Sequence, residues 1–194
     1  GVRLAIGGAI GLAHYTGVVR DTKDVDFYLL PADRERMIAA TRAAGFVDYY
    51  PQKPYDRTWI YRAVRGEDIA DLIWSTANHF TDVQPDWLAG PRTTVHGNRV
   101  TVLAPEAIVL SKFHIVQRER CDWPDIVNLL FAVGPDLDWH RLVRGAGDDA
   151  ALLGALLRFF GWLAPGRALP CRRPARPGFR DRPDRETTGV DGVV

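Results

Sequence analysis

Short apolar runs separated by glycine turns open the chain and predict a strand, turn, helix unit. Residues 4–6 form an apolar strand that runs directly into Gly7 and Gly8. Residues 9–15 have the composition of a helix, which we expect to end near Gly17 because glycine is favoured just past a helix C-terminus. Paired glycines before a helix leave its first N–H groups open to a phosphate, although such a pair is more often only a tight turn.

A period-two alternation follows and predicts a second strand over residues 24–30. Successive side chains of a strand point to opposite faces, so Asp24 and Asp26 are expected on the same face. A proline start, acidic first turns and the final Gly45 then bound a helix that we expect over residues 31–44.

Hairpins come before a series of helices in the rest of the pattern. Strands are expected over residues 59–64 and 69–74, and a hairpin over 93–102. Helices are expected over residues 105–118, 123–133, 139–143 and 149–163. The sequence thus predicts an α/β (α+β) protein, in which a mixed sheet with flanking helices is followed by a helical C-terminal segment.

This order divides the chain into a core over residues 1–104, a helical segment packed on it over residues 105–164, and a tail over residues 165–194. The tail is rich in Arg and Pro and has few aliphatic residues, so we expect it to be disordered. It holds seven Arg and four acidic residues, and the total charge of +1 therefore leaves the preceding body mildly acidic. This balance gives no electrostatic reason to expect a nucleic acid partner.

Length and composition exclude a membrane-spanning class. With 194 residues, the chain is long enough for one well-packed functional unit. Its 46% hydrophobic content is ordinary for a globular protein, and no apolar run approaches the ~20 residues of a membrane helix. Cys121 and Cys171 have no metal-binding spacing, so we expect a cytoplasmic protein without structural zinc.

Three acids carry the candidate chemistry. Residues i and i+2 of a strand lie about 7 Å apart, where two carboxylates repel by roughly 2 kcal/mol at an effective dielectric near 20. An isolated pair such as Asp24 and Asp26 is typical of a solvent-facing edge strand. Here Asp71 also interrupts an apolar strand, with Ile69 and Ile73 on its own face, and a buried acid needs a partner. Three converging carboxylates favour Mg²⁺ or Mn²⁺ and the chemistry of phosphoryl transfer.

The helical half adds a lysine and two acids. Lys112 shares an apolar helical stripe with Ile108 and Ile115, so its amine needs an anion, either a neighbouring acid or a phosphate. Asp122 precedes a Trp-Pro helix start, and Asp125 falls in its first turn. Capping of this helix accounts for both acids and is the interpretation that we favour for Asp122.

These residues together resemble a known group of proteins. Gly7 and Gly8, followed by Arg-Asp-Thr-Lys-Asp-Val-Asp-Phe over residues 20–27, resemble the G-G/S…D-x-D motif of polymerase-β-like nucleotidyltransferases. The opening is similar to that of small bacterial nucleotidyltransferases, and related abortive-infection toxins show a more distant likeness. The likeness covers residues 4–170 and implies the nucleotidyltransferase fold.

The resemblance also implies roles for named residues. Asp24 and Asp26 would hold the metals, with Asp71 as third metal ligand and general base. Nucleotide binding would involve the loop residues Gly7, Gly8, Arg20, Thr22 and Lys23. The related toxins use a lysine and an aspartate in their helical part, which correspond to Lys112 and to Asp122 or Asp125.

The expected function is transfer of a nucleoside monophosphate from an NTP, such as ATP, to an unidentified hydroxyl acceptor. The acceptor class is open between a small molecule, a protein and tRNA. Two alternatives remain: a catalytically silent, nucleotide-binding or antitoxin module, and a toxin that modifies tRNA. An acidic groove beside the carboxylates would count against the toxin.

Overall fold

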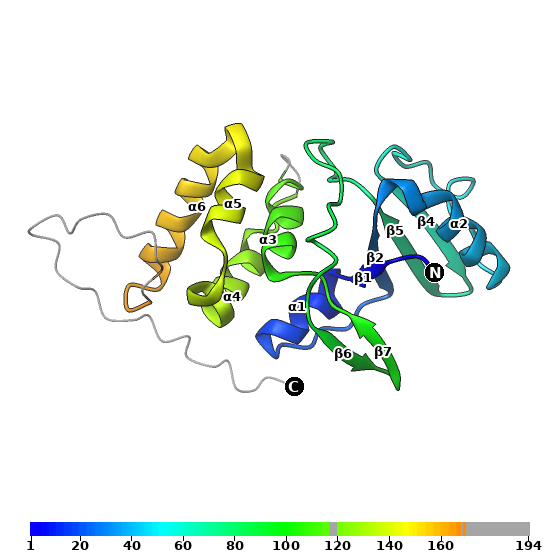
Figure 1. Cartoon of the computed structure of the whole chain (residues 1–194), viewed down its shortest axis with the longest axis horizontal. Coiled ribbons are helices and arrows are strands. Elements are labelled where there is room, and N and C mark those ends of the chain that lie inside the picture. Colours follow the sequence, from blue (N-terminus) through cyan, green and yellow to red (C-terminus); the bar gives the residue numbers. More distant parts are fainter. Residues whose placement is uncertain (117–119, 168, 170–194) are drawn as a thin grey trace, which may run out of the picture.

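A mixed sheet forms one end of the molecule and helices form the other, as the computed structural model shows (Figure 1). The structure describes residues 1–116, 120–167 and 169. Within them, the main sheet has five strands in the order β1-β2-β5-β4-β3, in which only β2 and β5 pair in parallel. The strands are β1 (Leu4–Ile6), β2 (Asp24–Leu29), β3 (Val47–Asp48), β4 (Ile60–Arg65) and β5 (Asp68–Ile73).

Helix α2 (Arg34–Ala43) covers one face of this sheet (Figure 1). It follows a single 3₁₀ turn, η1 (Pro31–Asp33). The sheet side chains beneath it form a buried apolar cluster, on which Met37 and Ile38 of α2 pack. The cluster contains Leu29, Tyr61, Ala63, Leu72 and Trp74. The alternation along β2 is therefore confirmed, because Leu29 points to α2 while the two aspartates point to the other face.

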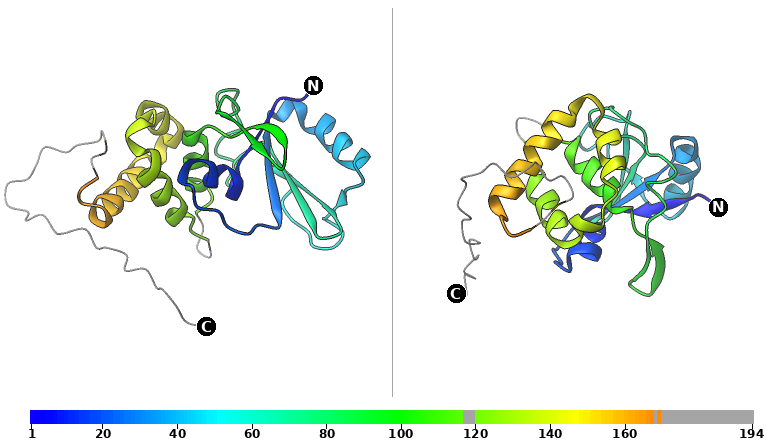
Figure 2. Two further views of the ribbon diagram at one scale, coloured as in Figure 1. Left: turned by 90° about the horizontal axis from the view of Figure 1, so that it is seen from below. Right: turned by 60° about the vertical axis from the view of Figure 1, so that its left-hand side comes forward.

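The chain between the main sheet and the helical half forms a second, two-stranded sheet that lies next to β1. Strands β6 (Arg92–Val95) and β7 (Asn98–Thr101) form the predicted hairpin, and its turn has positive φ at His96 (46°) and Gly97 (78°). Directly after β7, the N–H of Leu103 donates to the Ile6 carbonyl at 2.9 Å. The hairpin projects from the body of the protein (Figure 2).

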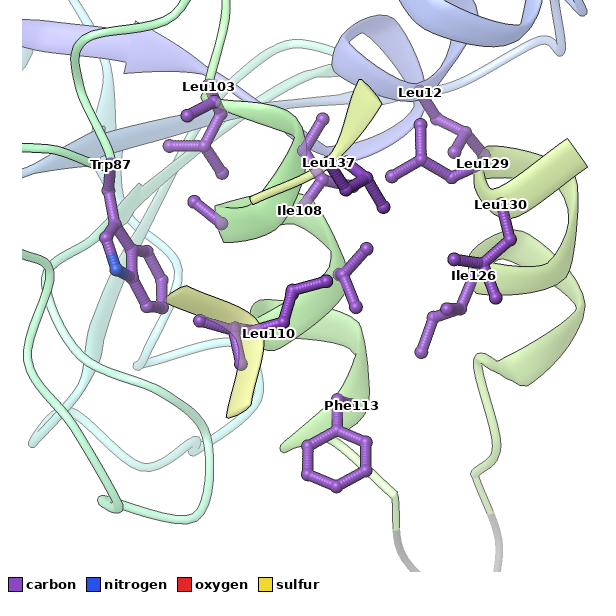
Figure 3. Packing of buried hydrophobic residues seen from close by; sticks show 14 of the residues in the cluster. Leu12, Trp87, Leu103, Ile108, Leu110, Phe113, Ile126, Leu129, Leu130 and Leu137 are labelled. Atoms are coloured by element: carbon purple, nitrogen blue, oxygen red, sulfur yellow. The ribbon is translucent and has the colours of Figure 1, made fainter. Parts of the chain in front are cut away.

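Four α-helices complete the described chain. They are α3 (Pro105–Phe113), α4 (Trp123–Val133), α5 (Trp139–Ala146) and α6 (Ala150–Leu163), with the 3₁₀ turns η2 (Gly134–Asp136) and η3 (Gly147–Asp149) between them. Helix α1 (Gly8–Thr16) packs against α3 and α4, where Leu12, Ile108 and Leu129 meet (Figure 3). The same cluster of buried residues includes Tyr28 on the sheet and Phe160 on α6. Sheet and helices therefore share this core, and each such buried side chain stabilises the fold by about 1.5–3 kcal/mol.

Several element boundaries differ from the sequence prediction. Helix α3 ends at Phe113, with His114 at its C-cap, and residues 117 and 118 of the predicted helix lie outside the described residues. The His114 ring lies within hydrogen-bond distance of the Gly145 carbonyl (3.1 Å). Helix α5 continues beyond Val143 to Ala146. The two-residue strand β3 was not predicted, since a pairing this short leaves no period-two pattern.

The last described residues lie against the helices. Arg167 stacks over the Phe131 ring at 5.5 Å from its centroid, and Leu169 packs on the core. The rest of the predicted tail, residues 170–194, lies outside the described residues. No helix in the described part of the chain is long and apolar enough to cross a bilayer.

Candidate active site

The two aspartates of β2 stand side by side at the surface of a cleft. Asp24 begins the strand, its side chain is 39% exposed, and the Thr22 hydroxyl donates to its Oδ1 at 2.6 Å. Asp26 lies one step further along the same face and is half-buried. Thr22, which the sequence predicts to bind nucleotide, lines the cleft and holds Asp24 with its hydroxyl.

The paired glycines press against these acids. Gly8 has φ of +53°, and a Cβ built there would lie 1.7 Å from Oδ2 of Asp26. The N–H of Gly7 donates to the Asp26 carbonyl at 2.9 Å, and a Cβ at Gly7 would lie 2.4 Å from the Tyr28 ring. No side chain caps the start of α1. Gly8 and Ala9 therefore present the positive end of a helix to the cleft beside the carboxylates.

Asp71 joins the pair from the neighbouring strand. It lies opposite Asp26 in the parallel β2–β5 register, and it is only 2% exposed. On its other side it faces Arg62 of β4, whose Nε and Nη2 donate to its two carboxylate oxygens at 2.7 and 2.5 Å. The same Nη2 lies 3.9 Å from Oδ2 of Asp24. A single guanidinium thus bridges two of the three acids.

The charges of this cluster act on one another. Burial, followed by the negative charges of Asp71 and Asp24, raises the pKa of Asp26 to about 7. The hydrogen bonds to Asp71 raise the pKa of Arg62, so this guanidinium stays charged at any working pH. The cluster therefore combines a fixed cation with a carboxyl group that is ionised only in part near neutral pH.

The acids form one wall of a cleft with a volume of about 510 Å³. Ten of the described residues that line it are charged, namely six aspartates and four basic groups. The aspartates are Asp21, Asp24, Asp26, Asp71, Asp122 and Asp125, and the basic groups are Arg20, Arg62, Lys112 and Arg120. Trp59, Tyr28 and Trp87 add aromatic surface, so the cleft offers both charge and flat apolar contacts.

The helical half contributes an ion network to the same cleft. The Lys112 amine lies 2.7 Å from Asp125 and 3.2 Å from Asp122. Arg20, from the loop before β2, donates to both oxygens of Asp125 at 2.9 and 3.1 Å, and Arg120 donates to Asp122. Of the two partners that the sequence left open for Lys112, the structure shows acids.

The side chain of Asp122 does not cap helix α4, contrary to the interpretation favoured from the sequence. It occupies the N-cap position of α4, yet its side chain makes no capping hydrogen bond. Its oxygens accept from Lys112 and Arg120 instead. Burial alone would raise the pKa of Asp122, but the hydrogen bond from Arg120 and the charge of Lys112 outweigh burial and hold this pKa below its usual value.

Most of the predicted site residues meet at this cleft. Gly8, Arg20, Thr22, Lys112 and the three acids Asp24, Asp26 and Asp71 all line it. The lining does not include Gly7, whose part is to support Asp26, or Lys23, which is exposed.

Arg62 is the main residue that the sequence interpretation missed. A signal was present in the sequence, because Arg62 shares one face of a strand with the apolar residues Ile60 and Val64. Asp71 shares a face with Ile69 and Ile73 in the same way. Only the register of β4 against β5 shows that these two charged residues lie opposite each other.

The donor chemistry of the cluster fits a divalent cation at Asp24 and Asp26. Both offer hard carboxylate oxygens to the cleft. Burial, and after it the charges of Asp71 and Asp24, raises the pKa of Asp26, and a bound cation would favour the ionised carboxylate. Among the described residues, no three His, Cys, Asp or Glu side chains form a ready group for a metal ion. Both oxygens of Asp71 already accept hydrogen bonds from Arg62, so Asp24 and Asp26 are the part of the cluster that fits.

Comparison with known proteins shows a likeness in fold. No family model and no curated protein sequence matches the chain. The solution structure of the antibiotic-resistance factor ANT(2'')-Ia matches 81% of this chain and 87% of its own, with a TM-score of 0.51 and 18% identity.

Two further structures are similar at lower scores. One is ANT(2'')-Ia in complex with adenylyl-2''-tobramycin (TM-score 0.48, 16% identity, 81% of this chain and 88% of that one). The other is the lincomycin-bound lincosamide antibiotic adenylyltransferase LnuA (0.45, 15%, 66% and 84%). The mixed sheet, its flanking helices and the helical C-terminal segment thus form a nucleotidyltransferase fold.

Proposed function

We propose that the protein is a metal-dependent nucleotidyltransferase, which transfers a nucleoside monophosphate from an NTP to a hydroxyl acceptor. The observation that carries this proposal is the meeting of Asp24, Asp26 and Asp71 beside the open helix start at Gly8, in one cleft. An acid cluster next to uncapped N–H groups combines a site for cations with a site for phosphate.

The start of α1 would hold the phosphates. Gly8 and Ala9 line the cleft, no side chain caps this helix start, and the helix dipole adds partial positive charge there. Lys112 and Arg20 lie in the same cleft, where Asp122 and Asp125 now hold them. The phosphate oxygens of a bound triphosphate would replace these carboxylates as partners of Lys112 and Arg20.

Asp24 and Asp26 would hold the cation. Asp71 would join them as a ligand if one of its carboxylate oxygens were released from its hydrogen bond with Arg62. When bound, a divalent cation neutralises charge on the triphosphate and on departing pyrophosphate. The side-chain hydrogen bond from Thr22 fixes Asp24 for this task. Gly8 closes tightly on Asp26 from the other side.

The transfer itself is an in-line displacement. The acceptor oxygen forms a bond to the α-phosphorus, and the bond between that phosphorus and the oxygen bridging to the β-phosphate breaks, so pyrophosphate leaves with the electron pair. Asp71, the proposed general base, takes the proton of the acceptor hydroxyl. Because its oxygens accept hydrogen bonds from Arg62, this step includes a shift of the guanidinium.

The charge of the cleft bears on the class of acceptor. Among the described residues that line the cleft, six aspartates against four basic groups leave a formal excess of negative charge. Nucleic acid binding normally shows a basic surface, so this wall counts against the tRNA-modifying toxin and supports a small or protein acceptor. The presence of all three acids favours an enzyme over a silent nucleotide-binding or antitoxin module.

The test is NTP consumption in the presence of Mg²⁺. Asp24→Asn and Asp26→Asn should each abolish it, whereas Asp68→Asn, an exposed change on β5 outside the cleft, should leave it intact. Incubation with each radiolabelled NTP and a cell extract should then reveal the acceptor as the labelled molecule. Unchanged turnover in the Asp24 and Asp26 variants would reject the assignment.

A further inference from the structure

The acid cluster already contains a cation of its own. Arg62 donates to both oxygens of Asp71, and Nη2 of Arg62 lies 3.9 Å from Asp24. Its side chain is 34% exposed, whereas that of Asp71 is 3% exposed. The guanidinium thus covers the buried acid and presents its remaining positive charge to the cleft.

A charge at this position acts on any second cation that approaches. At a separation of about 5 Å and an effective dielectric near 20, one unit charge repels a divalent cation by several kcal/mol. Asp71 would be the costliest of the three acids to leave unpaired, because it is buried. Arg62 satisfies that acid without a metal and opposes the binding of a metal at Asp24 and Asp26.

We propose that Arg62 is the resident counter-cation of the Asp24, Asp26 and Asp71 cluster and competes with a free divalent cation for it. The cation then binds strongly only together with a nucleoside triphosphate, whose own negative charge offsets Arg62. This inference rests on the proposed function for its nucleotide, but the competition itself concerns residues of this chain alone.

The same two strands supply a matched control. Arg65 faces Asp68 in the β4–β5 register, just as Arg62 faces Asp71. That pair is 54% and 69% exposed, lies 3.5 Å apart and does not line the cleft. Arg65→Gln therefore removes an arginine of β4 that is also paired across the ladder, without changing the cluster.

The experiment measures Mn²⁺ binding at pH 8 from the paramagnetic resonance signal of the free ion, without nucleotide. Arg62→Gln should bind Mn²⁺ at least about tenfold more tightly than the unmodified protein. Arg65→Gln should stay within about twofold of it. Arg62→Lys, which keeps the charge, should remain close to the unmodified protein. Equal or weaker binding by Arg62→Gln than by the unmodified protein would overturn the proposal.

A second measurement covers a loss of stability in Arg62→Gln, which leaves Asp71 without its partner. Mn²⁺ should then raise the melting temperature of this variant more than that of the unmodified protein, and should restore folding if the metal-free variant is unfolded. Failure of Mn²⁺ to do so would overturn the proposal.

A third arm adds a non-hydrolysable NTP analogue. The analogue should tighten Mn²⁺ binding to the unmodified protein and narrow its difference from Arg62→Gln. An unchanged difference would overturn the role of the triphosphate. These measurements need no turnover, so their outcome is independent of the proposed function. The NTP consumption assay tests that function separately.

Discussion

At position 8 the backbone runs so close to Asp26 that no side chain can stand between them. The φ of +53° disfavours any residue but glycine, and the Cβ position falls 1.7 Å from a carboxylate oxygen. The two effects differ in kind. The dihedral angle costs about 1 kcal/mol wherever it occurs, whereas the close approach concerns this site alone.

Gly8→Ala should therefore abolish NTP turnover and lower the free energy of unfolding by more than the dihedral angle alone. Gly66→Ala is the control, because Gly66 has φ of +60° with no atom within 4 Å of the added Cβ. We expect Gly66→Ala to cost about 1 kcal/mol and to leave turnover unchanged. Urea unfolding and NTP consumption measure both, and equal effects of the two variants would contradict the prediction.

Asp26 should make the stability of the metal-free protein depend on pH. Its folded pKa of about 7 lies above the ordinary value of 3.8, so between these values the folded state holds a proton that the unfolded chain has released. The stability that this proton contributes is present at low pH and is lost as the pH rises through about 7. In chelator at pH 8, Asp26→Asn should be more stable than the unmodified protein by roughly 1–4 kcal/mol.

The gain should shrink toward pH 5, where the unmodified protein is already protonated at this position. Asp68→Asn, exposed on β5, should show no such trend. Chemical unfolding at a series of pH values makes the comparison. A gain that does not vary with pH would mean that the Asp26 carboxyl titrates normally.

On the scale of elements, the first turn of α4 connects the helical half to the strand that carries the acids. Asp125 accepts from Lys112 of α3 and from Arg20 in the loop before β2. Two residues further along that loop, Thr22 holds Asp24. Helix α4 and strand β2 are thereby joined through side chains, although about a hundred residues separate them in sequence.

Asp125→Asn should loosen this connection. The change leaves Lys112 and Arg20 without their shared anion, and because Arg20 is 51% exposed we expect a cost of only about 1–3 kcal/mol. Asp136→Asn, an exposed change just past the other end of α4, should cost under about 0.5 kcal/mol. Urea unfolding measures both variants, and indistinguishable values would show that the network adds no stability.

For the whole molecule, the decisive feature is that one apolar core runs from the sheet to the last helix. The buried cluster includes Tyr28 and Ile60 of the sheet, Leu129 of α4 and Phe160 of α6. Neither half can lose its packing without exposing part of this cluster. We therefore expect the described part of the chain to unfold as one cooperative unit.

Leu129→Ala tests this expectation. Leu129 is fully buried, and its truncation should cost about 2–5 kcal/mol. Leu152→Ala on α6, which is 38% exposed, should cost under about 1 kcal/mol. Far-ultraviolet dichroism, dominated by the helices, should lose signal at the same denaturant concentration as the fluorescence of Trp59 and Trp74 near the sheet, read in a protein whose other four tryptophans are replaced by Phe. Separate midpoints would mean that the two halves unfold independently.

How much of this could be predicted from the sequence follows from what each pattern contains. Period-two alternation placed Asp24 and Asp26 on one face, and the isolated acid of an apolar strand marked Asp71, because side-chain direction in a strand depends only on residue parity. The two-residue strand β3 and the early end of α3 were not predicted. Strand β3 depends on its pairing with β4, where Val47 lies opposite Val64, a contact that no local pattern records.

The sequence by itself determined which residues carry charge, which face of each strand they occupy, and where glycine must precede a helix. Only the tertiary structure decided which charges meet. The β4–β5 register paired Arg62 with Asp71, and the packing of α4 brought Asp122 and Asp125 to Lys112. The reason is physical: local preference acts within a few residues, whereas an ion pair forms between whichever groups folding places within about 4 Å.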